Sequence, residues 1–454
     1  MISTSAVGAY IEKNSRRFVD ELKELCSFPS ISNHGQEAVK PARDWVAARL
    51  AKFTDRVETL EAGGMPAIYA EVPGAGHRRL LLYQHYDVQP VDPIELWESK
   101  PFEPVEKDGR IFARGVADDK ADVMARIHAL ETLKQIGEVP VTLRFLVEGE
   151  EEIGSKSFEH IAHKHADKLG ADGCLWESGD SFDAAGRPML QFGCRGLLYV
   201  QLRVRLLAFD QHSGFASIYP SAAMYLIEAL ASLRDQDMRI RIDGFHDRVV
   251  MPSDADRRMM ANIDPEVEER KRLVGFDHLI RDPQPGDVIE QLLFSPTCNV
   301  AGITTGYQGP GSKTVLPAET TAKLDFRLIP DQDPIDILAR LRNHFDSHGF
   351  DKVEIVWHDA EKPARSDPDS QIAKSLIECV RELHGEPVLW PFMQATGPMH
   401  PVVADLNIPT VLPVGAGRPD KRIHAPNENI HVADYINTVR LMCRVWERFG
   451  AGVG

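Results

Sequence analysis

The sequence predicts an α/β protein in which a smaller α+β domain interrupts a larger α/β domain. Toward both ends of the chain, short apolar runs alternate with stretches of helical periodicity, as in layered α/β domains. The middle of the chain instead contains strands of alternating polarity, which expose one face, together with two helical stretches. A third observation is length, because 454 residues with 43% hydrophobic composition exceed what a single core usually organises.

The elements of the first part follow from the spacing of apolar side chains. Helical spacing predicts amphipathic helices, whereas a continuous apolar run such as residues 80–83 predicts a strand buried on both faces. The predicted elements are, in order, helices at 18–26 and 42–53, a strand at 80–83, a helix at 122–136, and strands at 141–147 and 173–177.

The middle and the end of the chain divide in the same way. One-sided strands at 199–206 and 321–328 and helices at 222–233 and 335–345 predict the α+β insertion. The α/β pattern resumes with a helix at 370–384 and a strand at 410–414. We therefore predict a first domain part at residues 1–194, an inserted domain at 195–357, and a second domain part at 358–454.

Charge and cysteine usage exclude several classes of protein. The formal net charge of −16 disfavours nucleic acid and anionic membranes as partners. The six cysteines are scattered and form no C-x-x-C motif, which indicates reduced thiols and a cytoplasmic protein. No stretch approaches the roughly 20 apolar residues that span a bilayer.

Acidic and histidine side chains recur where predicted strands end, or in loops beside those ends. Functional sites of layered α/β domains gather at the carboxyl ends of the strands. Carboxylates and imidazoles are ligands for divalent cations. Two adjacent acidic residues alone usually lie in a solvated turn, but five elements of this kind together predict a metal centre. The side chains are His85, Asp87, Asp118, Asp119, Glu151, Glu152, Glu177 and His424.

Four motifs in this order resemble the M20 metallopeptidases, the co-catalytic zinc peptidases and amidohydrolases that include cytosolic dipeptidases, carnosinases, glutamate carboxypeptidases and aminoacylases. The resemblance runs from about residue 28 to the C-terminus, and two motifs look closest to the dipeptidase branch. It implies a zinc-peptidase-like catalytic domain, with a mixed sheet flanked by helices, interrupted by a ferredoxin-like lid and dimerisation domain. The motifs are HYDVQP at 85–90, RGVADDK at 114–120, EGEEEIGS at 148–155 and HAPNE at 424–428.

The resemblance implies two divalent metal ions per chain. Zn²⁺ is the expected ion, with Mn²⁺ or Co²⁺ as alternatives. His85, Asp118 and Glu177 would hold one ion, and Asp118, Glu152 and His424 would hold the other. A carboxylate shared in this way lets two cations act on one oxygen.

The remaining residues of these motifs take other roles in the resemblance. Asp87 would orient His85, and Glu151 would be the general base that moves a proton from the attacking water to the leaving amine. Asp119 would shape the backbone after Asp118, where the family often has a cis peptide bond.

The inserted domain carries a second set of residues implied by the resemblance. His212, in the sequence DQHSG, would reach the active site of the partner in a homodimer formed through the inserted domain and bind the reacting carbonyl. Arg327 would clamp the free carboxylate of a small peptide substrate, and Thr314 would assist.

One stretch departs from the family pattern. Dipeptidase relatives carry an Arg-x-Gly-Gly-Ser element, but residues 393–399 read MQATGPM and lack both the arginine and the serine. Thr396 is the candidate replacement for the hydroxyl, with Gly397 beside it in the substrate site.

The expected function is di-metal hydrolysis of an amide bond next to a free carboxylate, in the first place that of dipeptides. The alternatives are an N-acyl-amino-acid amidohydrolase that uses the same site, and a non-catalytic peptide-binding relative. Two other features receive structural interpretations. Cys174 is expected to be a small buried strand residue, and His160, His163 and His165 are expected to lie on a solvated helix face.

Overall fold

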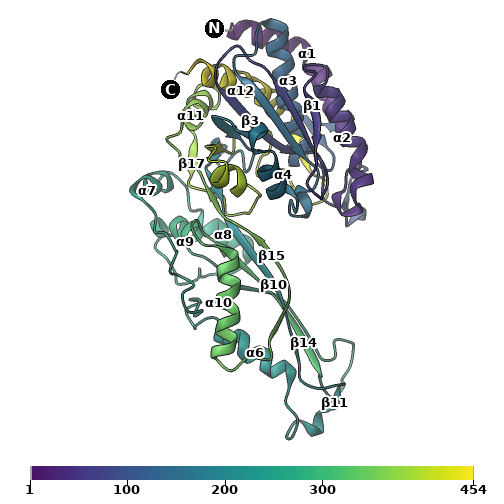
Figure 1. Cartoon of the computed structure of the whole chain (residues 1–454), viewed down its shortest axis with the longest axis vertical. Helices are drawn as coiled ribbons and strands as arrows, with labels where there is room; N and C mark the ends of the chain where they lie inside the picture. Colours follow the sequence, from purple (N-terminus) through teal and green to yellow (C-terminus); the bar gives the residue numbers. More distant parts are fainter. Residues whose placement is uncertain (1–2, 453–454) are drawn as a thin grey trace. The chain divides into compact units, whose positions relative to one another are not determined.

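The computed structural model describes residues 3–452, which form two compact units (Figure 1). The first unit comprises residues up to Gly193, Arg365–Pro391 and the residues from Pro398 onward. The second unit comprises Cys194–Ala364 and Phe392–Gly397. The predicted range of the inserted domain, 195–357, ends inside a strand of the second unit.

A six-stranded mixed sheet forms the centre of the first unit. Its strand order is β1-β2-β6-β3-β7-β18. The four strands from β6 to β18 in this order pair in parallel, whereas β2 is antiparallel to both β1 and β6. The predicted mixed sheet flanked by helices is therefore confirmed. The strands are β1 (Val57–Leu60), β2 (Ala67–Val72), β3 (Arg79–His85), β6 (Thr142–Glu148), β7 (Gly173–Leu175) and β18 (Thr410–Val411).

Strand β3 lies between β6 and β7 and is buried on both faces, as its continuous apolar run predicts. In the parallel register His85 pairs with Glu148, so that β3 and β6 end side by side. The acidic residues that follow β6 are thereby brought to the histidine that ends β3.

Helices flank the sheet (Figure 1). Helix α3 packs against both α1 and α12 and is buried along most of its length, which explains why apolar side chains surround it. The helices are α1 (Thr4–Cys26), α2 (Gln36–Leu50), α3 (Ala121–Ile136), α4 (Phe158–Lys164), α5 (Ala166–Leu169), α11 (Gln371–His384) and α12 (Val432–Ala451).

A largely buried ionic cluster joins α1, α2 and α3. The Glu21 carboxylate accepts hydrogen bonds from Arg49 at 2.6 Å and Arg17 at 2.8 Å, and lies 2.8 Å from Nε2 of His128. Burial alone would raise the pKa of Glu21, but hydrogen bonds from His128 and Arg17 outweigh it and lower the pKa to about 2. The charged carboxylate therefore stabilises the folded state.

We expect Glu21→Gln to lower the free energy of unfolding by about 2 kcal/mol at neutral pH, because the buried Arg49 and the half-buried Arg17 each lose one of their two carboxylate partners. The folded-state pKa lies below the ordinary glutamate value near 4.3. This stabilisation is therefore present above about pH 4.5 and is lost as the pH falls toward 2. Urea unfolding across this range should show the variant and the parent converging in acid. The exposed Glu12→Gln on the same helix is the control, and a pH-independent difference would contradict the assignment.

The second unit is built on a four-stranded antiparallel sheet with the order β12-β14-β10-β15. With helices α6 and α10 it has the βαββαβ chain order of the ferredoxin-like fold, which confirms that prediction. One sheet face and the two helices enclose a core that includes Leu198, Leu226 and Leu341. The elements are β10 (Gly196–Arg205), α6 (Ala222–Ser232), β12 (Asn299–Thr305), β14 (Glu319–Leu328), α10 (Pro334–Ser347) and β15 (Glu354–Glu361).

Further elements lie between these in the chain. Helices α7 (Asp254–Met260), α8 (Val267–Val274) and α9 (Val288–Phe294) separate α6 from β12. The short strands β11 (Gln211–His212) and β13 (Val315–Leu316) pair at the end of the second unit opposite α7 and α9 (Figure 1).

Among residues 3–452, no helix combines the length and the apolar character that a membrane crossing requires. All six cysteines are buried and none is paired in a disulfide, as the sequence predicts.

Candidate active site

The site begins where β3 ends. Asp87 follows His85 after one residue and is buried, with its Oδ1 3.4 Å from Nδ1 of His85. The same carboxylate accepts hydrogen bonds from the backbone N–H groups of Glu151 at 3.3 Å and Glu152 at 3.0 Å. Asp87 therefore fixes both the histidine ring and the 3-10 helix Glu151–Ile153 that follows β6.

Asp118 lies in the irregular segment that precedes α3. The buried carboxylate of Glu428 holds this segment by accepting hydrogen bonds from the backbone of Gly115 and Ala117, both at 2.8 Å, and of Asp118 at 3.2 Å. Arg114 also donates to Glu428 at 2.7 Å. The peptide bond between Asp118 and Asp119 is cis, as the family resemblance implies.

The two oxygens of Asp118 face two different histidines. Oδ1 lies 3.0 Å from Nε2 of His85, and Oδ2 lies 3.1 Å from Nε2 of His424. Glu177 approaches the first histidine at 3.4 Å, and Glu152 approaches the second at 3.0 Å. The structure thus brings together the five residues expected to bind metal, with Asp118 in the middle.

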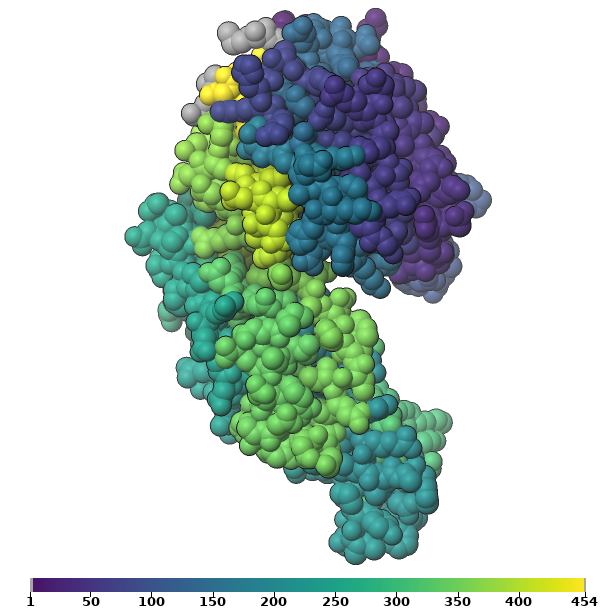
Figure 2. Space-filling view, viewed as in Figure 1, coloured from purple at the N-terminus to yellow at the C-terminus, as the bar shows by residue number. Residues whose placement is uncertain are grey.

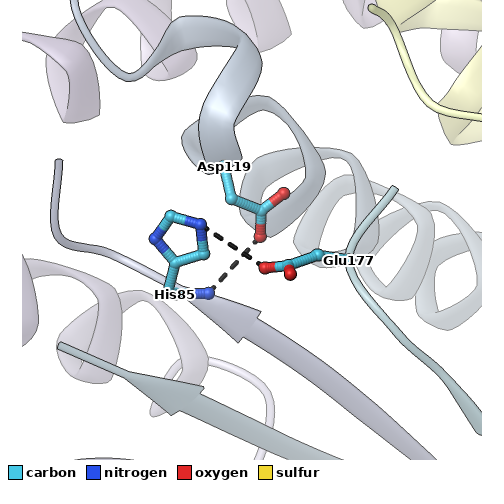
Figure 3. A group of neighbouring side chains, drawn as sticks. All are labelled: His85, Asp119 and Glu177. Carbon is cyan, nitrogen blue, oxygen red and sulfur yellow. Dashed lines mark hydrogen bonds and ion pairs between the residues drawn. The ribbon is translucent and has the colours of Figure 1, made fainter. Parts of the chain in front are cut away.

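Asp119 adds a side chain that the sequence interpretation used only for its backbone. Its carboxylate joins His85 and Glu177 in a group whose ligand atoms all lie within 4.8 Å of one another. Figure 3 shows these three side chains converging, with Oδ2 of Asp119 accepting a hydrogen bond of 3.4 Å from the His85 backbone. Because consecutive residues usually diverge, the sequence alone gave no reason to expect both aspartates to face the site.

The donor set fits divalent cations. Three neighbouring carboxylates, Asp118, Glu152 and Glu177, converge with two imidazoles, and nitrogen and oxygen donors of this kind suit zinc and similar ions. Oε2 of Glu177 is buried without a hydrogen-bond partner among residues 3–452. A buried oxygen of this kind costs free energy unless another group, such as a cation, satisfies it.

The pKa shifts of the group also indicate a site for a cation. Hydrogen bonds to Asp118 and Glu152 raise the pKa of His424 to about 10. Burial, opposed by His85 and aided by the nearby carboxylates of Glu152 and Asp118, raises the pKa of Glu151 well above its ordinary value. The site concentrates negative charge that a cation would compensate.

Two more positioning residues were not identified in the sequence. Asp122, on the first turn of α3, accepts a hydrogen bond of 2.7 Å from the backbone N–H of Ser178 and so holds the loop that carries Glu177. Arg126, one helical turn later, donates to the backbone oxygens of Tyr83 at 2.8 Å and Leu175 at 3.1 Å. Their spacing of four residues on one helix was the available signal.

The second unit contains two separate pairs of the predicted residues. Nε2 of His212 lies 3.2 Å from Oγ1 of Thr314, and Nδ1 of His212 accepts a hydrogen bond from the Gly214 backbone at 3.1 Å. At the other end of β14, Nη1 of Arg327 donates to Oγ1 of Thr396 at 2.6 Å. The backbone oxygen of Gly397, next to Thr396, accepts a hydrogen bond of 3.4 Å from the Cys194 thiol.

The structural interpretation of Cys174 is confirmed, and that of the three histidines holds in part. Cys174 is buried in β7, and burial raises the pKa of its thiol to about 12, so the neutral thiol persists. His163 does not extend freely into solvent, because its Nε2 lies 2.8 Å from Oδ2 of Asp405.

The chain matches known proteins along nearly its whole length. Cys-Gly metallodipeptidase dug1 of Schizosaccharomyces pombe is 27% identical over 467 residues, which cover 95% of each protein. Human Beta-Ala-His dipeptidase is 25% identical over 461 residues, 95% of this chain and 90% of that protein. The crystal structure of Sso-CP2, an M20 family metallo-carboxypeptidase from Sulfolobus solfataricus, matches with a TM-score of 0.90 and 35% identity, over 96% of this chain and 99% of that one.

Dug1 and Sso-CP2 are named as metallopeptidases, and the residue groups around Asp118 are candidate ligands for divalent metal ions. Residues 81–448 match the family model for peptidase family M20/M25/M40. The chain is therefore a member of peptidase family M20/M25/M40.

Proposed function

We propose that the protein is a di-metal dipeptidase that hydrolyses the amide bond next to a free carboxylate. The observation that carries this proposal is the position of Asp118, whose two oxygens face His85 and His424 while Glu151 lies in the same site. The relatives named for Cys-Gly and Beta-Ala-His dipeptides support this substrate class.

Within this proposal His85 and Glu177 would hold one ion, Glu152 and His424 would hold the other, and Asp118 would contribute to both. Two bound zinc ions would polarise the scissile carbonyl and acidify a water. The N2O3 ligand set favours zinc, with manganese and cobalt as alternatives.

Glu151 acts as the general base in this proposal. A glutamate carboxylate in this position can accept a proton from the attacking water and deliver it to the leaving amine nitrogen. Asp87 anchors the backbone N–H of Glu151 and thereby sets the direction from which the carboxylate acts.

Arg327 recognises the substrate carboxylate in this proposal. A guanidinium group binds a carboxylate through two parallel hydrogen bonds. The hydroxyl of Thr396 accepts one hydrogen bond from Nη1 and so holds the guanidinium in one orientation. In this proposal Thr396 and Gly397 replace the Arg-x-Gly-Gly-Ser element of dipeptidase relatives.

We further propose a homodimer through the second unit, in which His212 and Thr314 act on the partner's substrate. Arg327 lies eight residues beyond Glu319 on β14, which corresponds to about 26 Å, and His212 lies beyond the Glu319 end. One substrate molecule of dipeptide size cannot touch both Arg327 and His212 of the same chain.

The surface of the second unit supports pairing with a second copy. Strand β12 lies at an edge of its sheet, no strand within residues 3–452 pairs with its outer side, and edges of this kind are usually covered. On α6, Met224 and Ile227 are 52% and 45% exposed. Apolar side chains this exposed on a helix favour an interface.

The proposed location is the cytoplasm, and we propose no nucleic-acid or membrane partner. Six unpaired buried cysteines and a net charge of −16 support this part of the proposal.

Dipeptides with a free carboxylate should be cleaved, and amide-capped dipeptides should react at least about 100-fold more slowly, because Arg327 loses a charged partner. The panel should compare free dipeptides, amide-capped dipeptides, N-acetylated dipeptides, tripeptides and N-acyl amino acids by kcat/KM. Faster release of N-acyl groups would favour the amidohydrolase alternative. Comparable cleavage of N-acetylated peptides would indicate a carboxypeptidase like Sso-CP2, and no turnover with full metal content would indicate a binding protein.

A further inference from the structure

A second cluster of candidate metal ligands lies on the first unit and shares no residue with the group around Asp118. Glu159 and His163 are four residues apart on α4, so they share one face of that helix. His400 is the N-cap of the short helix Pro401–Asp405, which packs against α4, and Asp405 is the last residue of that helix. The first pair and the second pair are more than 200 residues apart in the sequence.

The donor atoms converge on Asp405. Nε2 of His163 lies 2.8 Å from Oδ2 of Asp405, and Nε2 of His400 lies 3.7 Å from Oδ1. Glu159, His163 and Asp405 each offer a ligand atom, and these atoms all lie within 4.8 Å of one another. Two imidazoles therefore approach one carboxylate, with a second carboxylate beside it.

Buried apolar side chains anchor the two helices that carry the cluster, α4 and the short helix Pro401–Asp405. Phe158, Ile161 and Ala162 bury the inner face of α4, and Val402 is buried under the short helix. The side chains of His163 and Asp405 are 50% and 31% exposed, so a dissolved ion can reach them. In Figure 2 the yellow-green surface around residue 400 adjoins the blue surface of the segment that contains α4.

An ion pair between His163 and Asp405 would explain one contact. It does not explain why a second imidazole presents Nε2 to the other oxygen of the same carboxylate and why Glu159 joins the group. Two nitrogen and two oxygen donors are a common set for a borderline cation, and such a set rarely suits magnesium or calcium.

We propose that Glu159, His163, His400 and Asp405 form a peripheral site for a divalent transition-metal ion, with Zn²⁺ as the expected ion. It shares no residue with the catalytic group around Asp118. A bound ion joins α4 to the short helix Pro401–Asp405, and it stabilises the folded chain by mass action.

The test counts zinc per chain in the intact protein at a series of buffered free-zinc concentrations. Wild type is expected to bind one ion more per chain than His163→Ala and Asp405→Asn, whose affinity for that ion falls at least about tenfold. His160→Ala, on the exposed side of the same helix, is the matched control and should bind like wild type. The catalytic ions are common to all four proteins and cancel in the difference.

A second readout is the zinc-dependent rise in melting temperature, which both site variants should reduce while His160→Ala keeps it. Circular dichroism before zinc addition checks that every variant is folded, and two variants of different chemistry guard against the failure of one. Equal zinc content and equal melting shifts in all four proteins would overturn the proposal and leave an ion pair only. The same conclusion would follow if wild type bound the extra ion only at millimolar zinc.

Discussion

Glu151→Gln is expected to lower kcat by about 1,000-fold, within the range that general-base catalysis supplies, while the metal content stays unchanged. Glutamine keeps the size and the backbone contact to Asp87 at 3.3 Å but cannot accept the proton from water. Metal analysis and steady-state kinetics on the same preparation check both parts of the expectation.

The metal measurement separates this role from that of a ligand. Glu152→Gln removes a side chain that lies 3.0 Å from Nε2 of His424, so this neighbouring variant should lose metal as well as activity. Retention of more than about a tenth of the parent kcat by Glu151→Gln would remove it as the base. Metal loss in both variants would make Glu151 a ligand instead.

The second large effect is expected from mixed dimers. His212→Ala and Glu151→Gln should each be nearly inactive as homodimers. Co-expression of the two chains with different affinity tags yields a heterodimer in which one site has an intact Glu151 and receives an intact His212 from the partner. Such a heterodimer should recover about half of the wild-type activity, because one of its two sites is complete.

The same experiment distinguishes action across the dimer from action within one chain. If His212 served its own chain, each site of the heterodimer would lack one residue, and the activity would stay near that of the homodimers. A purely monomeric protein would yield no heterodimer on the second affinity column. A heterodimer of wild type and the double variant is the control, and it too should separate the two cases: it is nearly inactive if His212 acts across the dimer.

The residues of the metal group could be predicted from the sequence because they lie at strand ends or in loops beside them, and because four of the five stand in motifs that resemble the M20 family. His85 ends β3 and Glu151 follows β6, and the parallel register of these strands brings the two ends together. In a layered α/β domain functional side chains gather at the carboxyl ends of the strands, although the placement of β6 between β2 and β3 does not follow from chain order.

The supporting contacts could not be predicted in the same way. Glu428 reaches the backbone of Asp118 across more than 300 residues, and nothing in the spacing of either segment indicates this contact. The cluster of His163 and Asp405 is similar, since the sequence shows histidines on a polar helix but not the carboxylate that approaches them.

An irregular strand of the second unit, β15, could not be predicted from the sequence. Strand β15 was not predicted, because its register shifts against β10 between Gln201 and Leu202 and its exposed side chains include Val356 and Trp357. Alternation of polarity, the usual signal of a one-sided strand, is therefore lost there. Helix α12, by contrast, has buried residues at helical spacing and could have been predicted.

The chain enters the second unit twice, first over Cys194–Ala364 and again over Phe392–Gly397. The second, shorter segment contains Thr396, whose hydroxyl accepts a hydrogen bond from Arg327 and fixes its orientation. A fragment excised as one continuous piece would carry the arginine without this anchor. Transplanting the module into another scaffold therefore calls for a graft in two pieces, and chimaeras joined only at the outer borders should inherit the fold without the oriented guanidinium.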